Sequence, residues 1–589
     1  MTEDHGARIV RSLIEHAPLD ACLDVLRALT GVDRYQASAG VEHAVSLVAE
    51  AAQLLGLPKA HVTTVPAVGE PRWFSFRTPV AWTPTLGRLR VPDARLVVDH
   101  AVQPFALATY SAPRRGRYRV IRPSAADITG RHDLRGTVAL VEPGLFAQGF
   151  TLEDLAGTGT EGLLLTDRRV VDATELRARV ELPPGSGLFG FSLTGSEFDS
   201  CRSASVASPP VFADINVRVA PEGRMPLLEL VLPGQDPQAA EVWVTSHLCH
   251  PRPGANDNAS GVAAALLLAA SIRAGGAAGL GPLRRTVRFI MGPEFLATAF
   301  VIHRALSSGT RPRCVLNLDM VGEDQQVCRS PLVLERSSTT TYGTVDASLE
   351  LGTRLAFEAT APHPGTWSSE PFLGFSDHAL FADPSVQVPA VALCHPADVF
   401  NHSDGDIFER VDPTELLRCG VAGAVAVALE AELPRTGPLR VQAGRQWAQE
   451  RWLEAVRAAS ARTEAGSAWT AGLLATTADR LGRAPTAGDG RASSGSAGPR
   501  YERAWEGPMN VRELVMGLPP ALRRRHDYLV REDKSVLSML FNALIRIGDG
   551  DDLAAILDDV SWNALRPLPD HAREHIVEVL AASSWVRAC

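Results

Sequence analysis

Cysteine is scarce in this sequence, and its few copies are scattered. Eight cysteines occur among 589 residues, and no two of them form a Cys-x-x-Cys pair. Disulfide frameworks and structural zinc knuckles need cysteines at short, regular spacings. We therefore expect neither in this chain, and we expect most of the cysteines to be small buried apolar residues.

Long apolar runs and an excess of basic charge are also missing. No stretch reaches the roughly 18 consecutive apolar residues that a membrane span requires, and residues 1–5 are polar with no apolar signal core behind them. The formal net charge is −9, and the only dense basic cluster, residues 523–525, is typical of a solvated helix face. The sequence thus predicts a cytoplasmic protein that binds neither membranes nor nucleic acid.

The chain of 589 residues is too long for a single hydrophobic core of ordinary size, so we expect several domains. Changes in residue composition and hydrophobic pattern along the chain predict where these domains lie. Residues 41–57 carry apolar side chains at helical spacing, whereas short strands broken by proline and glycine run from about 66 to 221. Helices dominate after about 436, with a Gly-, Ser- and Ala-rich linker at 484–499. We predict a discontinuous domain at 1–65 and 222–435, a β-rich insertion at 66–221, and a C-terminal helical region at 436–589.

The second part of the discontinuous domain alternates strands with helices. Apolar stretches predict strands at 227–232, 242–246, 287–291 and 315–318, and an alanine-rich stretch predicts a helix at 262–274. This alternation is typical of an α/β fold, a mostly parallel mixed sheet sandwiched by helices. In such folds the functional side chains gather at the carboxyl ends of the strands.

Histidine and carboxylate residues follow these predicted strands. His247 ends the strand at 242–246, Glu294 follows the strand at 287–291, and Asp319 follows the strand at 315–318. Asp257 precedes the alanine-rich helix, and His402 lies in a polar loop after an apolar strand. Imidazole nitrogen and carboxylate oxygen suit zinc, and two zinc ions about 3.5–4 Å apart polarise a carbonyl and activate a bridging water. The set predicts amide hydrolysis with two zinc ions, one ion being the alternative.

Each of these residues also has an ordinary structural interpretation. Asp257 is a suitable N-terminal cap for the helix that follows. Asp319 could simply end a strand in a turn, and an isolated His247 could be a hydrogen-bonded core residue. The ordered set is harder to explain in this way than any single member.

Six motifs occur in a fixed order in this part of the chain. They are a strand ending in His247, Asp-Asn-x-Ser-Gly at 257–261, a strand followed by Glu294, Asn-Leu-Asp-Met-x-Gly at 317–322, Ser-Asp-His at 376–378, and His-x-x-x-Asp at 402–406. The order resembles the zinc-dependent exopeptidase family of bacterial leucyl aminopeptidases, glutamate carboxypeptidase and glutaminyl cyclase. The resemblance covers residues 1–60 and about 222–435, and it implies the zinc exopeptidase fold.

The resemblance also implies roles for the five residues. Asp257 would bridge two zinc ions, with His247 and Asp319 completing one site and Glu294 and His402 the other. A cis peptide bond after Asp257 is implied as well. Residues 73–82, 97–110 and 247–251 resemble more closely an uncharacterised bacterial aminopeptidase-like subgroup, which brings no known substrate.

One smaller module also resembles something known. Inside the insertion, a turn and a buried strand at 134–141, a helix from 152, a Gly-rich turn at 157–162 and a strand at 163–165 follow one another. This run resembles a protease-associated domain, at about 130–205, although a generic α/β insertion is the alternative.

The first departure from the family pattern concerns the residue that orients the first histidine. The family usually has an aspartate two residues after that histidine, whereas this chain has Cys249. Since cysteine is a poor hydrogen-bond acceptor, we expect His247 to be held less firmly or differently. His250 then becomes a competing ligand.

The second departure concerns the catalytic base. The family has two adjacent glutamates, the first a general base and the second a ligand, but here Glu294 is followed by Phe295. Glu294 is therefore a candidate for both roles. If it is a ligand, the base must come from Glu370, Asp377 or a hydroxide on the metal.

Residues between the last two motifs are candidates for the substrate pocket. Asp377 and His378 would line the pocket or support the metal ligands, with a helix cap as the alternative. Trp367, Phe372 and Phe375 would form an apolar side-chain pocket, with ordinary loop packing as the alternative.

These observations favour an aminopeptidase acting on peptides or small aminoacyl amides. The insertion and the C-terminal helices would narrow access and so favour short substrates. Two alternatives remain: acyl transfer or cyclisation on the same zinc scaffold, and a weakened interaction protein that keeps the fold. A homo-oligomer is left open.

Overall fold

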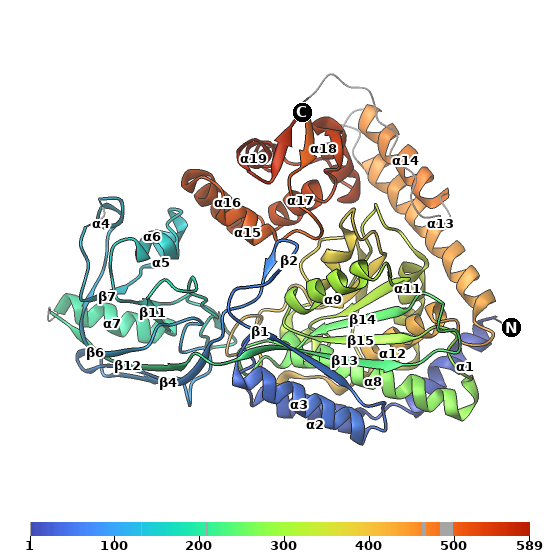
Figure 1. Ribbon diagram of the computed structural model, residues 1–589, viewed down its shortest axis with the longest axis horizontal. Coiled ribbons are helices and arrows are strands. Elements are labelled where there is room, and N and C mark those ends of the chain that lie inside the picture. Colours follow the sequence, from blue (N-terminus) through green and yellow to red (C-terminus); the bar gives the residue numbers. More distant parts are fainter. Residues whose placement is uncertain (1, 131, 208–209, 462–466, 483–498) are drawn as a thin grey trace.

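The computed structural model describes residues 2–130, 132–207, 210–461, 467–482 and 499–589 (Figure 1). The predicted linker at 484–499 falls almost wholly outside these residues. Figure 1 shows the insertion on the left, the main α/β domain on the right, and the C-terminal segment above the main domain.

An eight-stranded mixed sheet forms the centre of the main domain. Its central strands β15, β14, β16 and β19 are parallel neighbours, whereas β1, β13 and β17 join by antiparallel pairing. The order across the sheet is β1 (His61–Pro66), β13 (Arg224–Leu232), β15 (Val287–Gly292), β14 (Val242–His247), β16 (Cys314–Leu318), β19 (Ala390–Cys394), β17 (Leu332–Glu335) and β18 (Trp367–Glu370). The predicted α/β fold is confirmed, and each predicted strand lies inside or close to an observed one.

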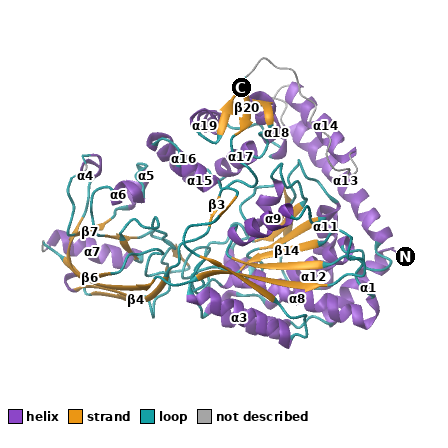
Figure 2. Ribbon diagram, viewed as in Figure 1, coloured by secondary structure: helices purple, strands orange, loops and turns teal. Residues whose placement is uncertain are grey.

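One face of this sheet is covered by helices from both parts of the discontinuous domain. Their apolar side chains form one continuous core with those of the sheet. The helices are α1 (Thr2–Glu15), α2 (Leu19–Thr30), α3 (Ala39–Leu54), α8 (Gly261–Gly275), α11 (Thr344–Ala359) and α12 (Pro413–Glu430). Figure 2 shows α3 and α8 along the lower side of the sheet.

The helical stretch Ala255–Leu280, which includes α8, is long and apolar enough to cross a membrane by length and composition. However, 72% of its apolar 18-residue window is buried inside the protein. Small side chains explain its close packing, since a Cβ added to Gly420 of α12 would lie 2.5 Å from Leu267. Ala255–Leu280 is therefore the central core helix of the domain.

The opposite face of the sheet is covered partly by the C-terminal segment. Helix α9 (Leu296–Ser307), the short helix η4 (Asp377–Ala382) and the hairpin β2 (Arg72–Trp73)–β3 (Phe76–Arg77) share a second apolar core with this segment. Phe541, for example, lies 6.3 Å from Phe372 between ring centroids. The C-terminal segment is thus part of the same folded body.

The C-terminal segment contains seven helices among the described residues and also a small sheet that the sequence did not predict. The helices are α13 (Gly437–Ala461), α14 (Ser467–Gly482), α15 (Val511–Met516), α16 (Pro520–Glu532), α17 (Ser535–Leu544), α18 (Leu553–Asn563) and α19 (Asp570–Ala582). The sheet has the order β21 (Asp549–Asp552), β20 (Arg500–Arg503), β22 (Val586–Ala588). Because β20 and β22 are far apart in the chain, local sequence patterns do not reveal their pairing.

The insertion is built on a seven-stranded mixed sheet. Its order is β11 (Phe189–Ser192), β8 (Gly162–Leu165), β7 (Thr137–Leu140), β6 (Arg114–Ile121), β12 (Phe212–Ala220), β4 (Thr83–Val91) and β5 (Leu96–Asp99). The predicted strand–helix–strand run appears as β7, α6 (Leu152–Ala156) and β8, with β7 and β8 parallel. Its resemblance to a protease-associated domain stays a prediction.

Candidate metal centre

Three of the predicted ligands meet at the carboxyl edge of the central strands. His247 is the last residue of β14, and Asp319 follows the neighbouring strand β16. The Nε2 atom of His247 lies 3.2 Å from Oδ1 of Asp257 and 3.2 Å from Oδ1 of Asp319. These side chains are almost wholly buried, so their polar atoms face one another in a water-poor site.

The second oxygen of Asp257 faces two further imidazoles. Its Oδ2 atom lies 3.3 Å from Nε2 of His250 and 3.2 Å from Nε2 of His402. Asp257 therefore lies between two groups, with His247 and Asp319 on one side and His250 and His402 on the other. A carboxylate whose two oxygens face separate groups would suit the bridging role that the family resemblance implies, and that role stays a prediction.

Hydrogen bonds determine the tautomers of His247 and His250, and in both rings the lone pair of Nε2 points to a carboxylate oxygen. The Nδ1 atom of His247 lies 3.1 Å from the Cys249 carbonyl, and that of His250 lies 2.8 Å from the Pro251 carbonyl. A carbonyl can only accept, so both Nδ1 atoms carry the hydrogen. In the neutral rings each Nε2 is then a hydrogen-bond acceptor, and the carboxylate oxygen that it faces is also an acceptor. Either a proton or a cation must therefore lie between the two atoms. The donor set of imidazole nitrogens and carboxylate oxygens fits zinc.

Glu294 lies beside His247 and Asp319 rather than beside His402. The ligand atoms of these three residues lie within 4.8 Å of one another, as do those of His250, Asp257 and His402. This grouping differs from the expected one, in which Glu294 and His402 shared a site. His250 therefore occupies the place that the resemblance had assigned to the glutamate.

Cys249 contributes to this arrangement through its backbone and its sulfur. Its carbonyl orients His247, and its Sγ accepts the backbone N–H of Glu294 at 3.2 Å. Burial, opposed by His247 and aided by Asp319, raises the pKa of Glu294 to about 7. A half-buried carboxylate with such a pKa is suited to accept and return a proton near neutral pH.

A second layer of polar groups fixes the bridging carboxylate. Asp406 accepts the backbone N–H of Asn256 at 2.6 Å and that of Asp257 at 2.9 Å. The peptide bond from Asp257 to Asn258 is cis, as the family resemblance implied. Gly261 allows the following helix to start close to β16, because an added Cβ would lie 2.3 Å from the Leu318 carbonyl oxygen.

Comparison with known proteins decides the family of this region. The sequence model described as peptidase family M28 matches residues 229–427. This part of the chain belongs to peptidase family M28. A search of the curated proteins found no match to the chain.

Several solved structures are similar to this chain in fold. A candidate peptidase from Clostridium acetobutylicum is similar over 100% of both chains, with 13% identity and a TM-score of 0.51. A zinc aminopeptidase from Bacillus subtilis covers 70% of this chain and 94% of its own, with 17% identity and a TM-score of 0.50. An M28 peptidase precursor from Shewanella amazonensis is similar over 73% of this chain and 97% of its own chain, with 14% identity and a TM-score of 0.50. At such identities the likeness shows the fold.

Arg34, which sequence analysis missed, holds the loop that carries His250. It is fully buried, and its guanidinium donates to the carbonyls of Leu248 and Gly254, each at 3.0 Å. Its backbone also pairs with that of His250. Burial lowers the pKa of Arg34 to about 10, which keeps it charged at neutral pH. An isolated arginine near the N-terminus gives no local signal of this role.

The remaining predicted site residues of the M28 domain have distinct positions. Ser376 donates to Oδ2 of Asp319 at 2.7 Å, and Asp377 accepts the backbone N–H of Phe295 at 2.7 Å. His378 pairs with Glu335 at 2.6 Å, away from the two groups of ligands.

The predicted aromatic pocket residues divide between the core and the surface. Trp367 lies on the edge strand β18 and packs against the main core, and Phe372 is buried against the C-terminal segment. Phe375 is 42% exposed. The pocket-lining role of Trp367 and Phe375 stays a prediction.

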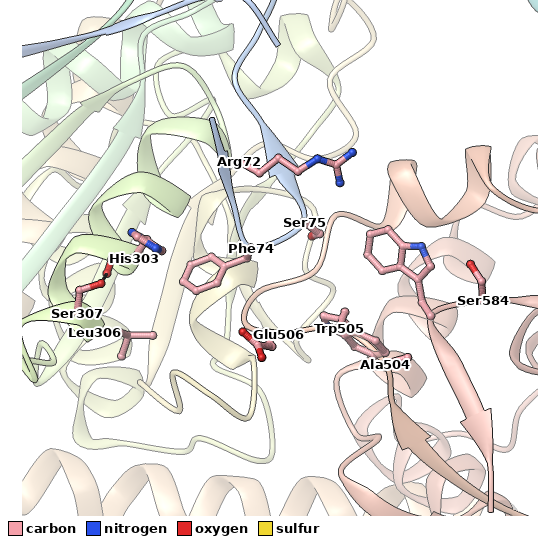
Figure 3. A pocket seen from close by; sticks show the side chains of 11 residues that line it. Arg72, Phe74, Ser75, His303, Leu306, Ser307, Ala504, Trp505, Glu506 and Ser584 are labelled. Carbon is pink, nitrogen blue, oxygen red and sulfur yellow. Dashed lines mark hydrogen bonds between the residues drawn. The ribbon is translucent and has the colours of Figure 1, made fainter. Parts of the chain in front are cut away.

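One cavity among the described residues lies away from the metal centre. It measures about 730 Å³ and separates the β2–β3 hairpin and α9 from the C-terminal segment. Figure 3 shows Phe74 and His303 on one side and Trp505 on the other. None of the residues that line it belongs to the metal centre, so its size carries no argument about the M28 chemistry.

Zinc binding to the M28 centre is expected to weaken as the pH falls. Without a cation, burial opposes the charge on His247, but Asp319 and Asp257 outweigh it and hold the pKa of His247 well above its ordinary value. The proton must leave when zinc binds, so the affinity should rise about tenfold per pH unit for each proton displaced. Competition with a chromogenic chelator between about pH 6 and pH 9 measures this. An affinity that stays constant over that range would contradict the protonated metal-free state.

Proposed function

We propose that this chain is a zinc-dependent exopeptidase, an aminopeptidase that hydrolyses the N-terminal amide bond of short peptides or small aminoacyl amides. The observation that carries the proposal is the position of Asp257, with one oxygen facing His247 and the other facing His250 and His402. The M28 family match and the similarity to the zinc aminopeptidase of Bacillus subtilis support it.

The site residues would have distinct roles as metal ligands and as a base. His247, Asp257 and Asp319 would hold one zinc ion, and Asp257, His250 and His402 the other. Bound zinc would polarise the scissile carbonyl and make a water more acidic. Glu294 accepts the proton of the attacking water and returns it to the leaving amine nitrogen. With His250 as a ligand of the second ion, Glu294 would be free to act as the base.

Substrate size is limited by the parts that surround the edge of the sheet. The insertion reaches the loop that carries His402, where Ala178 pairs with Ser403. The C-terminal segment reaches the insertion, where Arg531 of α16 donates to the Phe146 carbonyl. Such covering favours short peptides over folded proteins.

Metal removal tests this function directly. The zinc-loaded protein is expected to release nitroaniline from leucyl-p-nitroanilide, to lose that activity after dialysis against a chelator, and to regain it with zinc. Metal analysis of the same samples should show about two zinc ions per chain before dialysis. Turnover that survives complete loss of metal, or a loaded protein without turnover of any aminoacyl substrate, would contradict the proposal.

A further inference from the structure

One face of the insertion sheet is packed, and the other is exposed. Inward side chains of β4, β5, β6 and β12 form an apolar core with those of α7 (Gly195–Ala207). Because successive side chains of a strand point to opposite faces, the intervening residues of these strands point outward. In Figure 1 the strands β6, β12 and β4 form the lower border of the insertion, with α7 above them. The outer face therefore lies on the side away from α7.

Six exposed arginines lie on this outer face. Cross-strand pairing places them on one side, since Asp214 of β12 lies opposite Arg117 on one neighbouring strand and opposite Arg90 on the other. Six arginines and the two aspartates, Asp214 and Asp99, give the face a net charge of +4, although the whole chain carries −9. The six are Arg88, Arg90, Arg115, Arg117, Arg119 and Arg218, and we call them the arginine face.

Most of these arginines have no acidic partner within the protein. Arg88 donates to Asp99 at 2.7 Å, and Arg117 lies 4.0 Å from Asp214. The other four make no ion pair with any residue that the structure describes. The side chains of Arg88 and Arg117 are 62% and 63% exposed, so solvent weakens even these two pairs. Like charges close together on a sheet repel one another, and an anionic partner would offset that repulsion.

The spacing of the arginines indicates what kind of anion fits. Alternate residues of a strand are about 6.7 Å apart, so Arg115, Arg117 and Arg119 form a row about 13 Å long. The arginines of β4 lie about 10 Å to the side of this row, across β12. The same repeat of about 6.7 Å separates alternate side chains of any extended polypeptide. Carboxylates at every second position of such a segment would therefore meet the row in register, and a guanidinium binds a carboxylate through two parallel hydrogen bonds.

Two other polyanions fit the arginine face less well. Binding of single-stranded nucleic acid relies on aromatic side chains that stack with bases. Phe212 is the only aromatic residue among the outward positions of β4, β5, β6 and β12, and the Arg117 guanidinium already covers its ring at 5.0 Å. A nucleic acid or an anionic bilayer also extends far beyond this field and would meet the negative charge of the rest of the chain. A short acidic segment meets the arginine face alone.

We propose that the arginine face binds an extended acidic segment of another protein, whose carboxylates at every second position pair with Arg115, Arg117 and Arg119. Arg88 and Arg90 border the bound segment across β12. This gives the insertion a binding function separate from the metal centre, because none of these arginines belongs to either group of candidate ligands. The inference does not depend on the exopeptidase function.

Fluorescence anisotropy with labelled peptides tests the proposal on the full chain. The probe is a Glu-Ser repeat of about ten residues, long enough to cover the row, with the dye on its N-terminal nitrogen so that an aminopeptidase cannot cleave it. A triple variant, Arg115→Gln with Arg117→Gln and Arg119→Gln, is expected to bind it at least about tenfold more weakly than the parent, because three exposed charge pairs are lost. Raising the salt from about 50 to about 300 mM should weaken binding to the parent at least about threefold.

A second peptide tests the spacing. It carries the same number of glutamates at every third position, where an extended chain turns them alternately to opposite faces. Fewer carboxylates can then face the row at once, so the parent should bind this peptide at least about threefold more weakly than the Glu-Ser repeat.

A second triple variant controls for the change in net charge. Arg435→Gln with Arg445→Gln and Arg457→Gln removes three exposed arginines in or next to α13, and it should keep the affinity of the parent. Both triple variants should also keep the melting temperature and the leucyl-p-nitroanilide turnover of the parent, since neither set lies in a core or at the metal centre.

Four results would overturn the proposal. They are an unchanged affinity in the triple variant of β6, equal binding of the two peptides, no measurable binding of the Glu-Ser repeat at low salt, and tighter binding of a different polyanion through the same arginines. A thymidine oligonucleotide and vesicles of phosphatidylglycerol with phosphatidylcholine are the probes for the last result, which would make the partner a nucleic acid or a membrane. All four are binding measurements, so failure of the exopeptidase function would leave the proposal standing.

Discussion

The Glu294→Gln variant is expected to lose about 10²- to 10⁴-fold in kcat and to keep both zinc ions, because loss of a general base removes proton transfer without removing a ligand. In the structure Glu294 is half-buried beside His247 and Asp319, and its backbone N–H is held by Cys249. Glutamine has the same shape and cannot accept the proton. Steady-state kinetics on leucyl-p-nitroanilide, with metal analysis of the same sample, measures both effects.

The pH profile gives an independent measurement of the same role. A base must be unprotonated to act, so kcat/KM should fall as the pH falls through the pKa of Glu294. Burial raises that pKa to about 7 in the metal-free protein, and nearby cations lower it. The acid limb is therefore expected at or below about pH 7. The pH profile of the residual activity of the Glu294→Gln variant should lack this acid limb.

The control for this variant is another glutamate that sequence analysis offered as a base. Glu370 is exposed on the edge strand β18, and Glu370→Gln should keep its activity. If Glu294→Gln instead lost one zinc ion per chain, Glu294 would be a ligand and the base would lie elsewhere. A variant with full metal and full activity would remove Glu294 from the mechanism.

The His250→Ala variant is expected to bind about one zinc ion in place of two and to lose at least about 100-fold in kcat/KM. His250 is fully buried, and its Nε2 faces the same Asp257 oxygen as His402. Without it, the second ion would be held by Asp257 and His402 alone, too few protein ligands for a stable zinc site. Metal analysis and isothermal titration with zinc measure the stoichiometry.

A matched histidine keeps the test of His250 specific. His303 on α9 is exposed in the large cavity away from the metal centre, so His303→Ala should retain two zinc ions. Two zinc ions in His250→Ala would show that another group, with Glu294 the nearest candidate, completes the second site. That result would restore the ligand set implied by the family resemblance.

The sequence by itself determined the fold of the main domain and the candidate ligands. Strand periodicity and the alternation of strands with helices are local properties, so β14, β15 and β16 could be placed from residue patterns alone. The ends of those strands then located His247, Glu294 and Asp319, since the carboxyl ends of parallel strands share one edge. Motif order supplied Asp257 and His402.

Only the tertiary structure decided which of these groups meet. His250 lies beside His402 in a loop that Arg34, more than 200 residues earlier, holds through contacts with the Leu248 and Gly254 carbonyls. Cys249 orients His247 with its carbonyl, which the side-chain chemistry of cysteine could not reveal.

The C-terminal segment illustrates the same limit on a larger scale. Its helices were visible in the sequence, but their packing against α9 and η4, and the pairing of β20 with β22, join residues far apart in the chain. Local patterns encode secondary structure and the kinds of side chain available. Distances between atoms depend on contacts distant in sequence, and the choice between base and ligand at Glu294 depends on those distances.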